Sequence, residues 1–525
     1  MGGINLRMIK LFRYIVAFAI LPLILVGCGG DNAIEQNKEN SDKQVSSSKI
    51  AGELVIATRI PKTFNPLLNT DSDIDQVLKL VYDTLVDIND EIKPVKSIAE
   101  SWQVNDIGTS VNIKLRNDVF WHDGQNLTTE DVIYSLDTLR NAQESLYKKN
   151  VKNILSYEVV DKYNLKIVYN KPAGDIPYTL YFPIIPKHYY DVKTEVTEPL
   201  GSGKYKFISY EPSKQIKLEL NEKYFKKAGN IKNIVIKIIQ DKTVEEEAFK
   251  QNQIDFIYTD KLNMQKYAKD KKSNQFECET LYYDFLGFNL RNNYLNDKRV
   301  RQAMAYIIDK KSFLNKYYLG FADIADTPIH PNSWLYLKDM TRYSYDKRRA
   351  EKLVREVLGD KQEKINLRIL VNEENYQRVN IANYLKNELD SIGFNTTIEK
   401  YNMQDYMKKI DNRDFDILLG GWKLSKFPDL TFMFNSGESD TGKNYGGYKD
   451  AQTDLLLEKA FISFQEEDMR VAYKELQKRI YDELPYISIA FRKNIVYTNP
   501  KLKGELKPLE WNVFNNIESC KINSK

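Results

Sequence analysis

The chain contains few of the side chains that most often bind metal ions or act as catalytic bases and nucleophiles. It has 3 histidines and 3 cysteines among 525 residues, and the histidines stand far apart, at positions 122, 188 and 330. No Cys/His cluster and no Gly-x-Ser-x-Gly segment occurs, so the sequence indicates neither a zinc site nor a hydrolase triad. We therefore expect no metal, no cofactor and no enzymatic activity, with a catalytic pair of carboxylates as the alternative that sequence leaves open.

Charge of one sign, internal repeats and long apolar runs are also missing from the body of the chain. The formal net charge is +4, and lysines are spread among acids along the whole length, which is not typical of a nucleic-acid-binding protein. No segment after Val26 is apolar enough to cross a membrane. The 42% hydrophobic and 29% charged residues are those of an ordinary globular protein, long enough for two or three domains.

The N-terminus has the pattern of a signal peptide that ends at a cysteine. A start with three basic residues precedes an apolar run over 15–26, which is shorter than the roughly 20 residues of a membrane-spanning helix. The segment Leu25-Val26-Gly27-Cys28 resembles the bacterial lipobox, whose cysteine is acylated after cleavage. The resemblance predicts a signal peptide over 1–27 and a lipid on Cys28 that anchors the protein outside the cell membrane. An uncleaved signal anchor is the alternative.

Residues 28–49 predict a flexible tether, because they are polar and hold almost no apolar side chain that a core could bury. The folded body is expected to begin near Ile50. Met8 is an alternative start to Met1, since the residues after it still supply positive charge. Cys278 and Cys520 either pair in an oxidising exterior or remain two free thiols.

Helical and strand periodicities alternate along the body, which predicts an α/β protein with mixed sheets covered by helices. Strands are predicted at 53–57, 110–115, 165–169, 216–220, 234–239, 283–290, 365–371, 395–399 and 414–420. Helices are predicted at 73–85 and 376–392, and two more within 455–484. One further helix is predicted to begin at a cap at Thr128 or Thr129, one to begin after a cap at 296–297, and one to end at Gly359.

The segment 199–205 contains a Gly-Lys pair that invites comparison with a phosphate-binding loop. The Walker pattern requires glycine at position 198 and serine or threonine at position 205, but Glu198 and Tyr205 stand there. The segment is therefore predicted to be a turn, and no nucleotide site is expected.

Several short segments stand in the order and spacing of a known family. They are Ile98-Ala99-Glu100-Ser101-Trp102, Val119-Phe120-Trp121-His122-Asp123-Gly124, the turn 199–207, Asp297-Lys298-Arg299-Val300-Arg301-Gln302-Ala303-Met304, Asp416-Ile417-Leu418-Leu419-Gly420-Gly421-Trp422 and Asn444-Tyr445-Gly446-Gly447-Tyr448. Together they resemble the family 5 solute-binding proteins, the extracytoplasmic receptors of peptide and nickel ABC importers. The turn departs from the family pattern, because Lys204 replaces a proline.

The resemblance implies a two-lobed fold of the periplasmic-binding-protein type II class with an extra domain. Domain I would comprise 50–87, 200–280 and 491–525, domain II 88–199, and domain III, the second lobe, 281–490. A ligand would lie between the lobes and shift an open form toward a closed form that the permease recognises. The implied partners are a short peptide and the ABC permease, without nucleic acid, and the protein is expected to act as a monomer on the cell surface, with a Gram-positive host indicated by the Lys- and Asn-rich composition.

The resemblance also implies ligand-binding residues around Trp422, whose flat ring would line the cleft. In peptide-binding members an acid three places after this tryptophan takes the ligand's ammonium group, but Ser425 stands there. Asp429, seven places after Trp422, either replaces that acid or caps the following helix. Lys423 and Lys426 flank the same loop and either attract a carboxylate or are merely solvated.

The resemblance also implies that the glycine-broken loop with Asn444, Tyr445 and Tyr448 approaches the cleft, where amphipathic rings would suit a variable ligand. His122 is expected to be structural, and Arg299 and Arg301 are expected to form surface or inter-lobe ion pairs. Short peptides are the predicted cargo. A nickel chelate, haem or an oligosaccharide is the alternative cargo, and signalling without import is the alternative role.

Overall fold

The computed structural model describes residues 52–191, 197–260, 273–359 and 363–523. The predicted signal peptide, the lipidation site Cys28 and the tether lie outside the described residues and stay predictions. The described residues belong to one unit of mutual contacts, Ile50–Lys525. Among them, every helix is too short or too polar to span a lipid bilayer.

A four-stranded sheet combines the start of the body with a segment almost 150 residues later. Its order is β1 (Glu53–Thr58), β10 (Asn233–Ile238), β9 (Gln215–Leu220) and β8 (Tyr205–Glu211). β1 runs parallel to β10, and the other neighbours are antiparallel. The helix α1 (Ser72–Val81) contacts β1 and β8, and α5 (Lys242–Lys250) follows β10.

The helix α1 is shorter than the 73–85 that its periodicity predicts. Its last residue is Val81, and Tyr82 is already extended. The chain leaves the helix because other segments take its backbone groups: Gly203 N–H donates to Val81 O at 2.8 Å, and Leu85 N–H donates to Phe182 O at 3.0 Å. The apolar residues that follow form β2 (Val86–Ile88), which pairs with β3 (Pro94–Lys96).

A second four-stranded sheet is antiparallel, in the order β4 (Ala99–Val104), β5 (Ser110–Leu115), β7 (Asn164–Tyr169) and β6 (Ile154–Val159). The helix α2 (Thr129–Asn141) begins after Thr128, whose N–H donates to the Asp131 carboxylate at 2.9 Å. Shorter elements complete this part: η1 (Lys148–Val151), α3 (Ile176–Thr179) and α4 (Lys187–Tyr190).

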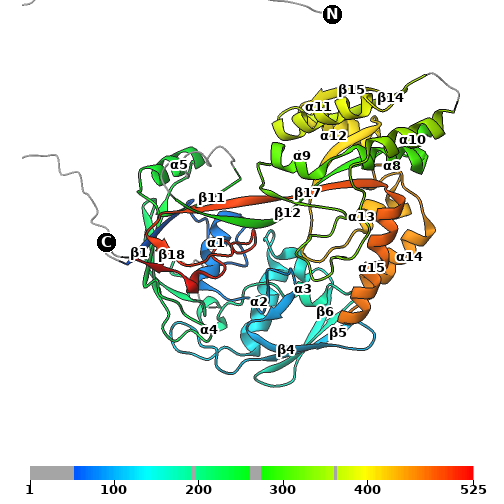
Figure 1. Ribbon diagram of the computed structural model, residues 1–525. Helices are drawn as coiled ribbons and strands as arrows, with labels where there is room; N and C mark the ends of the chain where they lie inside the picture. Colours follow the sequence, from blue (N-terminus) through cyan, green and yellow to red (C-terminus); the bar gives the residue numbers. More distant parts are fainter. Residues whose placement is uncertain (1–51, 192–196, 261–272, 360–362, 524–525) are drawn as a thin grey trace, which may run out of the picture. The chain divides into compact units, whose positions relative to one another are not determined.

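The largest sheet is built around two long strands, β12 (Asn274–Phe288) and β17 (Tyr486–Thr498), which lie side by side in Figure 1. Its order is β11 (Phe256–Thr259), β17, β12, β16 (Ile417–Lys423), β14 (Ile365–Asn372) and β15 (Phe394–Tyr401), and β13 (Ala322–Ile324) pairs with β17. β14 is parallel to β15 and β16, whereas β12 is antiparallel to β16 and β17.

Helices cover the β14, β15 and β16 part of this sheet and enclose a separate apolar core with it. The elements not yet described, which include these helices, are α7 (Asn293–Asn296), α8 (Lys298–Ile307), α9 (Lys310–Tyr317), α10 (Lys347–Leu358), α11 (Tyr376–Asp390), α12 (Met403–Asp411), α13 (Thr431–Phe434), η2 (Ser436–Glu438), α14 (Ala451–Ile462), α15 (Glu466–Glu483), β18 (Leu502–Lys503), η3 (Ile517–Ser519) and β19 (Lys521–Ile522).

The α/β prediction is confirmed. One expectation about α8 is wrong, however, because Arg301 is neither on the surface nor in an ion pair. Its side chain is buried and donates to the carbonyls of Leu295, Asn296, Glu483 and Leu484. Arg299 behaves as expected and pairs with Asp297 at 2.7 Å.

The predicted division into three domains stays a prediction. The boundaries predicted at 280/281 and 490/491 both fall inside strands, namely β12 and β17. The two cysteines of the body, Cys278 and Cys520, are buried free thiols.

The turn at 201–203 gives a test of how these segments pack. A Cβ on Gly201 would lie 1.9 Å from Val81 O, a backbone atom that cannot rotate away as the end of a flexible side chain could. We expect Gly201→Ala to lower the free energy of unfolding by about 3 kcal/mol. Gly320→Ala is the control: Gly320 has φ +85° but nothing within 4 Å, so it should cost about 1 kcal/mol. Equal decreases in the free energy of unfolding of the two variants, measured by urea denaturation, would contradict the close contact between Gly201 and Val81.

Candidate functional site

The candidate site begins where β16 ends. Trp422 lies on β16 opposite Tyr283 of β12, and the next residue, Lys423, lies opposite Tyr282. On its other side β12 pairs with β17, and this pairing is irregular between Glu279 and Tyr283. The loop 424–430 therefore leaves the sheet beside the point where the two long strands lose their regular register.

Trp422 is half-buried in an aromatic cluster. Its ring stacks on Tyr445, with centroids 5.8 Å apart and an interplanar angle of 10°, and meets the edge of Phe432 at 5.2 Å. The Lys443 ammonium lies 5.6 Å from the Trp422 ring centroid. The indole N–H of Trp422 is buried and makes no hydrogen bond within the described residues, so it is a donor that a ligand acceptor would satisfy.

The glycine-broken loop is held together by two of its predicted ligand residues. Asn444 is fully buried, donates to the carbonyls of Asn435 (3.1 Å) and Tyr448 (2.7 Å), and accepts from Tyr448 N–H at 3.1 Å. The Tyr448 hydroxyl shares a hydrogen bond with Thr453 at 2.9 Å. These polar groups are therefore engaged within the loop, whereas Tyr445 faces Trp422.

The loop after Trp422 carries two lysines in different environments. Lys423 is exposed, and its ammonium pairs with the Glu510 carboxylate at 2.5 Å. Lys426 lies over the rings of Tyr181 (4.6 Å) and Trp511 (5.8 Å). No carboxylate of the described residues lies within ion-pair distance of Lys426, and burial lowers the pKa of its ammonium to about 8.

The contacts of Ser425 do not indicate that it replaces the missing acid. Its side chain is exposed, and its hydroxyl donates to Phe427 O. Phe427 is buried and meets the ring of Tyr178 edge-on at 5.5 Å. The serine thus shapes the loop while the phenylalanine fastens it to a segment almost 250 residues earlier in the chain.

Asp429 accepts a hydrogen bond from Thr431 N–H at 3.0 Å, in front of α13. The N-cap residue of α13 is Leu430 rather than Asp429, so this contact resembles the capping expected as the alternative without placing Asp429 at the cap, and it occupies one carboxylate oxygen. Asp429 also lines a cavity of about 650 Å³ together with Lys171, Asp454, Glu458 and Phe461, among others. Trp422 does not line this cavity.

A second carboxylate, Asp175 in the segment after β7, is close enough to Asp429 to be affected by its charge. Burial, and then the charge of Asp429, raise the pKa of Asp175 to about 6, and Lys171 opposes this shift. A buried carboxylate beside a second acid is a place where a bound cation is favoured, because the cation stabilises the ionised form of Asp175.

A smaller cavity, of about 270 Å³, adjoins the other face of the loop. Its lining includes Gln76 of α1, Tyr258 of β11, Tyr282 of β12, Asn494 of β17 and the Lys423–Glu510 pair. Gln76 donates to Glu510 O at 3.0 Å and Asn494 donates to the Tyr258 hydroxyl at 2.6 Å. Polar groups from five separate segments thus converge beside the end of β16.

Sequence reasoning did not single out Asp175, Tyr181, Glu510 or Trp511. Each lies in a segment without a motif of its own, and each reaches the loop after Trp422 only through the fold. His122, by contrast, is structural as expected: its Nε2 shares a hydrogen bond with Gly203 O at 2.9 Å, and burial lowers its pKa to about 4.

Comparison with known proteins gives consistent results. Residues 93–444 match the family described as bacterial extracellular solute-binding proteins, family 5 middle. The oligopeptide-binding protein AppA of Bacillus subtilis is 25% identical over 521 residues, covering 92% of this chain and 94% of that protein. Its crystal structure with a nonapeptide has a TM-score of 0.59 and covers 90% of this chain and 99% of that one.

A relative with different cargo is equally similar. The structure of NikZ from Campylobacter jejuni in complex with Ni(L-His) is 26% identical, has a TM-score of 0.63, and covers 90% of this chain and 100% of that chain. These neighbours confirm the predicted periplasmic-binding-protein-like fold.

The burial of Asp175, together with the nearby charge of Asp429, predicts a pH-dependent stability. The pKa of Asp175 rises from 3.8 to about 6 in the folded protein, so between about pH 4 and 6 the folded state binds more protons and stability falls as pH rises. Asp175→Asn lacks this penalty. Its free energy of unfolding, relative to the parent protein, should be about 1–2 kcal/mol higher at pH 7.5 than at pH 4, after allowance for partial exposure.

Urea denaturation at the two pH values measures this difference. Asp429→Asn should give a smaller effect of the same sign, because it removes the repelling charge. Asp106→Asn, in an exposed turn, is the control and should change stability equally at both pH values. A pH-independent effect of Asp175→Asn would show that the pKa of Asp175 is not raised in the folded protein, and a pH-independent effect of Asp429→Asn would show that Asp429 does not contribute to the shift.

Proposed function

Because the chain belongs to the bacterial extracellular solute-binding proteins of family 5, we propose that it is the substrate-binding subunit of an ABC importer and captures short peptides. The observation that supports this choice of ligand is a set of polar groups around β16 that a ligand could still bind: the Trp422 indole N–H, the Lys426 ammonium, Asp175 and the second carboxylate oxygen of Asp429. A zwitterionic peptide offers an acceptor, a carboxylate and an ammonium that match them.

In this proposal the ligand is gripped and not transformed. Trp422 and Tyr445 present a flat aromatic wall, Trp422 donates to a ligand carbonyl, and Lys426 attracts a carboxylate. Asp429, aided by Asp175, takes the ammonium in place of the acid that Ser425 lacks. Asn444 and Tyr448 support the wall from behind. The protein would act as a monomer without a cofactor and would deliver the closed form to the permease.

The first test asks which molecules occupy the cleft. Mass spectrometry of the protein purified under native conditions, before and after incubation with a mixture of di- to nonapeptides, should show bound peptides within a narrow length range. A defined metal chelate or haem in place of peptide would overturn the cargo. Hydrolysis of the added peptides would overturn the non-enzymatic role.

Asp429 gives a sharper test of how the ligand's ammonium group is bound. In the parent protein, acetylation of a peptide's N-terminus should weaken binding by at least about tenfold, because it removes the charge that Asp429 pairs with. In Asp429→Asn, free and acetylated peptides should bind alike. Asp440→Asn is the matched control, since Asp440 is exposed and pairs with Lys449. Isothermal titration calorimetry measures the six affinities of the three proteins for the two peptides, and an acetylation penalty that persists in Asp429→Asn would contradict the assignment.

We also propose that Cys28 carries the lipid that keeps the receptor on the extracytoplasmic face of the cell membrane, probed most directly in a Gram-positive host. In cells fed a labelled fatty acid, the protein should carry the label and sediment with membranes. Cys28→Ala should remove both the label and the membrane association, whereas Cys278→Ala should keep both. A labelled Cys28→Ala protein would disprove lipidation at this cysteine.

A further inference from the structure

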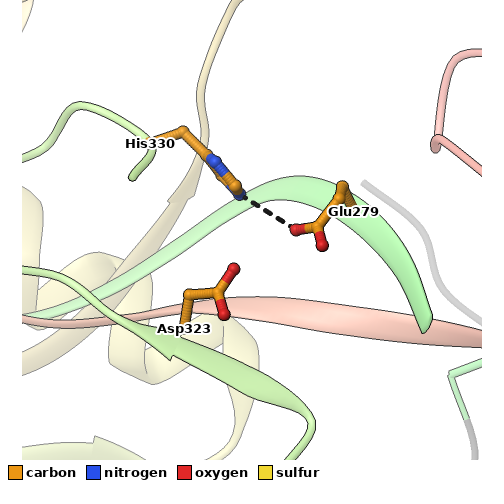
Figure 2. Close-up of side chains that lie close together, drawn as sticks. All are labelled: Glu279, Asp323 and His330. Atoms are coloured by element: carbon orange, nitrogen blue, oxygen red, sulfur yellow. Dashed lines mark ion pairs between the residues drawn. The ribbon is translucent and has the colours of Figure 1, made fainter. Parts of the chain in front are cut away.

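Three potential metal ligands from separate segments meet on the long strands. Glu279 lies on β12, Asp323 on β13, and His330 in the segment after β13. One ligand atom from each lies within 4.8 Å of the other two. Figure 2 shows the two carboxylates and the imidazole pointing toward one another, with Glu279 Oε2 3.5 Å from His330 Nε2.

The facing atoms are buried and unsatisfied. The His330 side chain is 2% exposed, and its Nε2 makes no hydrogen bond. Glu279 Oε2 and Asp323 Oδ2 are likewise buried without a hydrogen-bond partner. Buried polar atoms are rarely left in this state, and three such atoms facing one another indicate a missing partner.

The charges of the cluster leave room for a cation. The Lys493 ammonium is shared by three carboxylates, Glu277 at 2.9 Å, Glu279 at 3.2 Å and Asp323 at 2.9 Å. No other lysine or arginine of the described residues lies within ion-pair distance of these three acids.

We propose that Glu279, Asp323 and His330 form a binding site for a divalent transition-metal ion, with water completing the coordination. Two carboxylate oxygens and one imidazole nitrogen suit zinc and the neighbouring divalent ions. Glu279 and Asp323 are 18% and 28% exposed, which provides a route of entry for the ion. The site is separate from the proposed ligand residues, so the metal-site proposal can be tested independently of peptide capture.

The hydrogen bonding of His330 makes the proposal specific. Asn332 N–H donates to His330 Nδ1 at 3.1 Å, so the neutral ring carries its proton on Nε2 when no metal is bound. Coordination through Nε2 moves that proton to Nδ1 and gives up this one hydrogen bond. Metal binding should therefore switch the tautomer of His330.

The small number of histidines makes this switch measurable. The mature protein, labelled with ¹⁵N-histidine and stripped with EDTA, should give three imidazole signals, each assigned by a His→Gln variant. One equivalent of Zn²⁺ should move the signal of His330 from the Nε2–H to the Nδ1–H pattern and leave those of His122 and His188 in place. An unchanged His330 signal at saturating Zn²⁺ would overturn the proposal.

Affinity measurements provide the second arm. Zn²⁺ titrated into the stripped protein should bind with one-to-one stoichiometry, and Co²⁺ should give visible absorption bands. His330→Gln and Asp323→Asn should each weaken Zn²⁺ at least tenfold, and Asp323→Asn guards against misfolding because its side chain is partly exposed. His188→Gln is the control, since His188 pairs with Asp123 at 2.8 Å. Zn²⁺ binding that both site variants retain would contradict the assigned ligands.

Discussion

The pairing of β12 with β17 is the interaction on which the rest of the structure depends. The two strands are hydrogen-bonded from Asn274 opposite Thr498 to Gly287 opposite Tyr486, with register shifts on either side of Tyr283 and Asp284. β11 and β13 pair with β17, and β16 pairs with β12. The largest sheet is therefore assembled on this one ladder.

A buried ionic cluster stabilises the ladder at its irregular point. Asp284 is 6% exposed and pairs with Arg378 of α11 and Arg492 of β17, each at 3.1 Å, and it accepts from the Tyr318 hydroxyl at 3.0 Å. Arg378 also packs against Gly421, the residue before Trp422. Breaking such a buried cluster costs stability, so β12, β17, α11 and the start of the loop 424–430 are held in one arrangement. The groups proposed to bind a peptide and those proposed to bind a metal are both positioned by this ladder.

Local patterns predicted the fold well and the site only partly. The alternation in 110–115 and the helical spacing after Asp297 are properties of neighbouring residues, and both elements form as expected. The early end of α1 depends on the hydrogen bond from Gly203 N–H to Val81 O and on the one that Phe182 O accepts from Leu85 N–H, and no local pattern contains either. Trp422 was found through the family resemblance. Asp175, Glu510 and the cluster around His330 were not, because their meeting depends on the tertiary fold and leaves no spacing in the sequence. The scarcity of histidine, which argued against a metal site, does not bear on a site built from one histidine and two acids.

The central claim is that binding of a ligand shifts the protein from an open to a closed form. Small-angle X-ray scattering of the purified protein, with and without a peptide that calorimetry shows to be bound, tests this claim most directly. The account predicts a smaller radius of gyration and a shorter maximum dimension in the complex. Identical scattering profiles for the free protein and the fully occupied complex would contradict it.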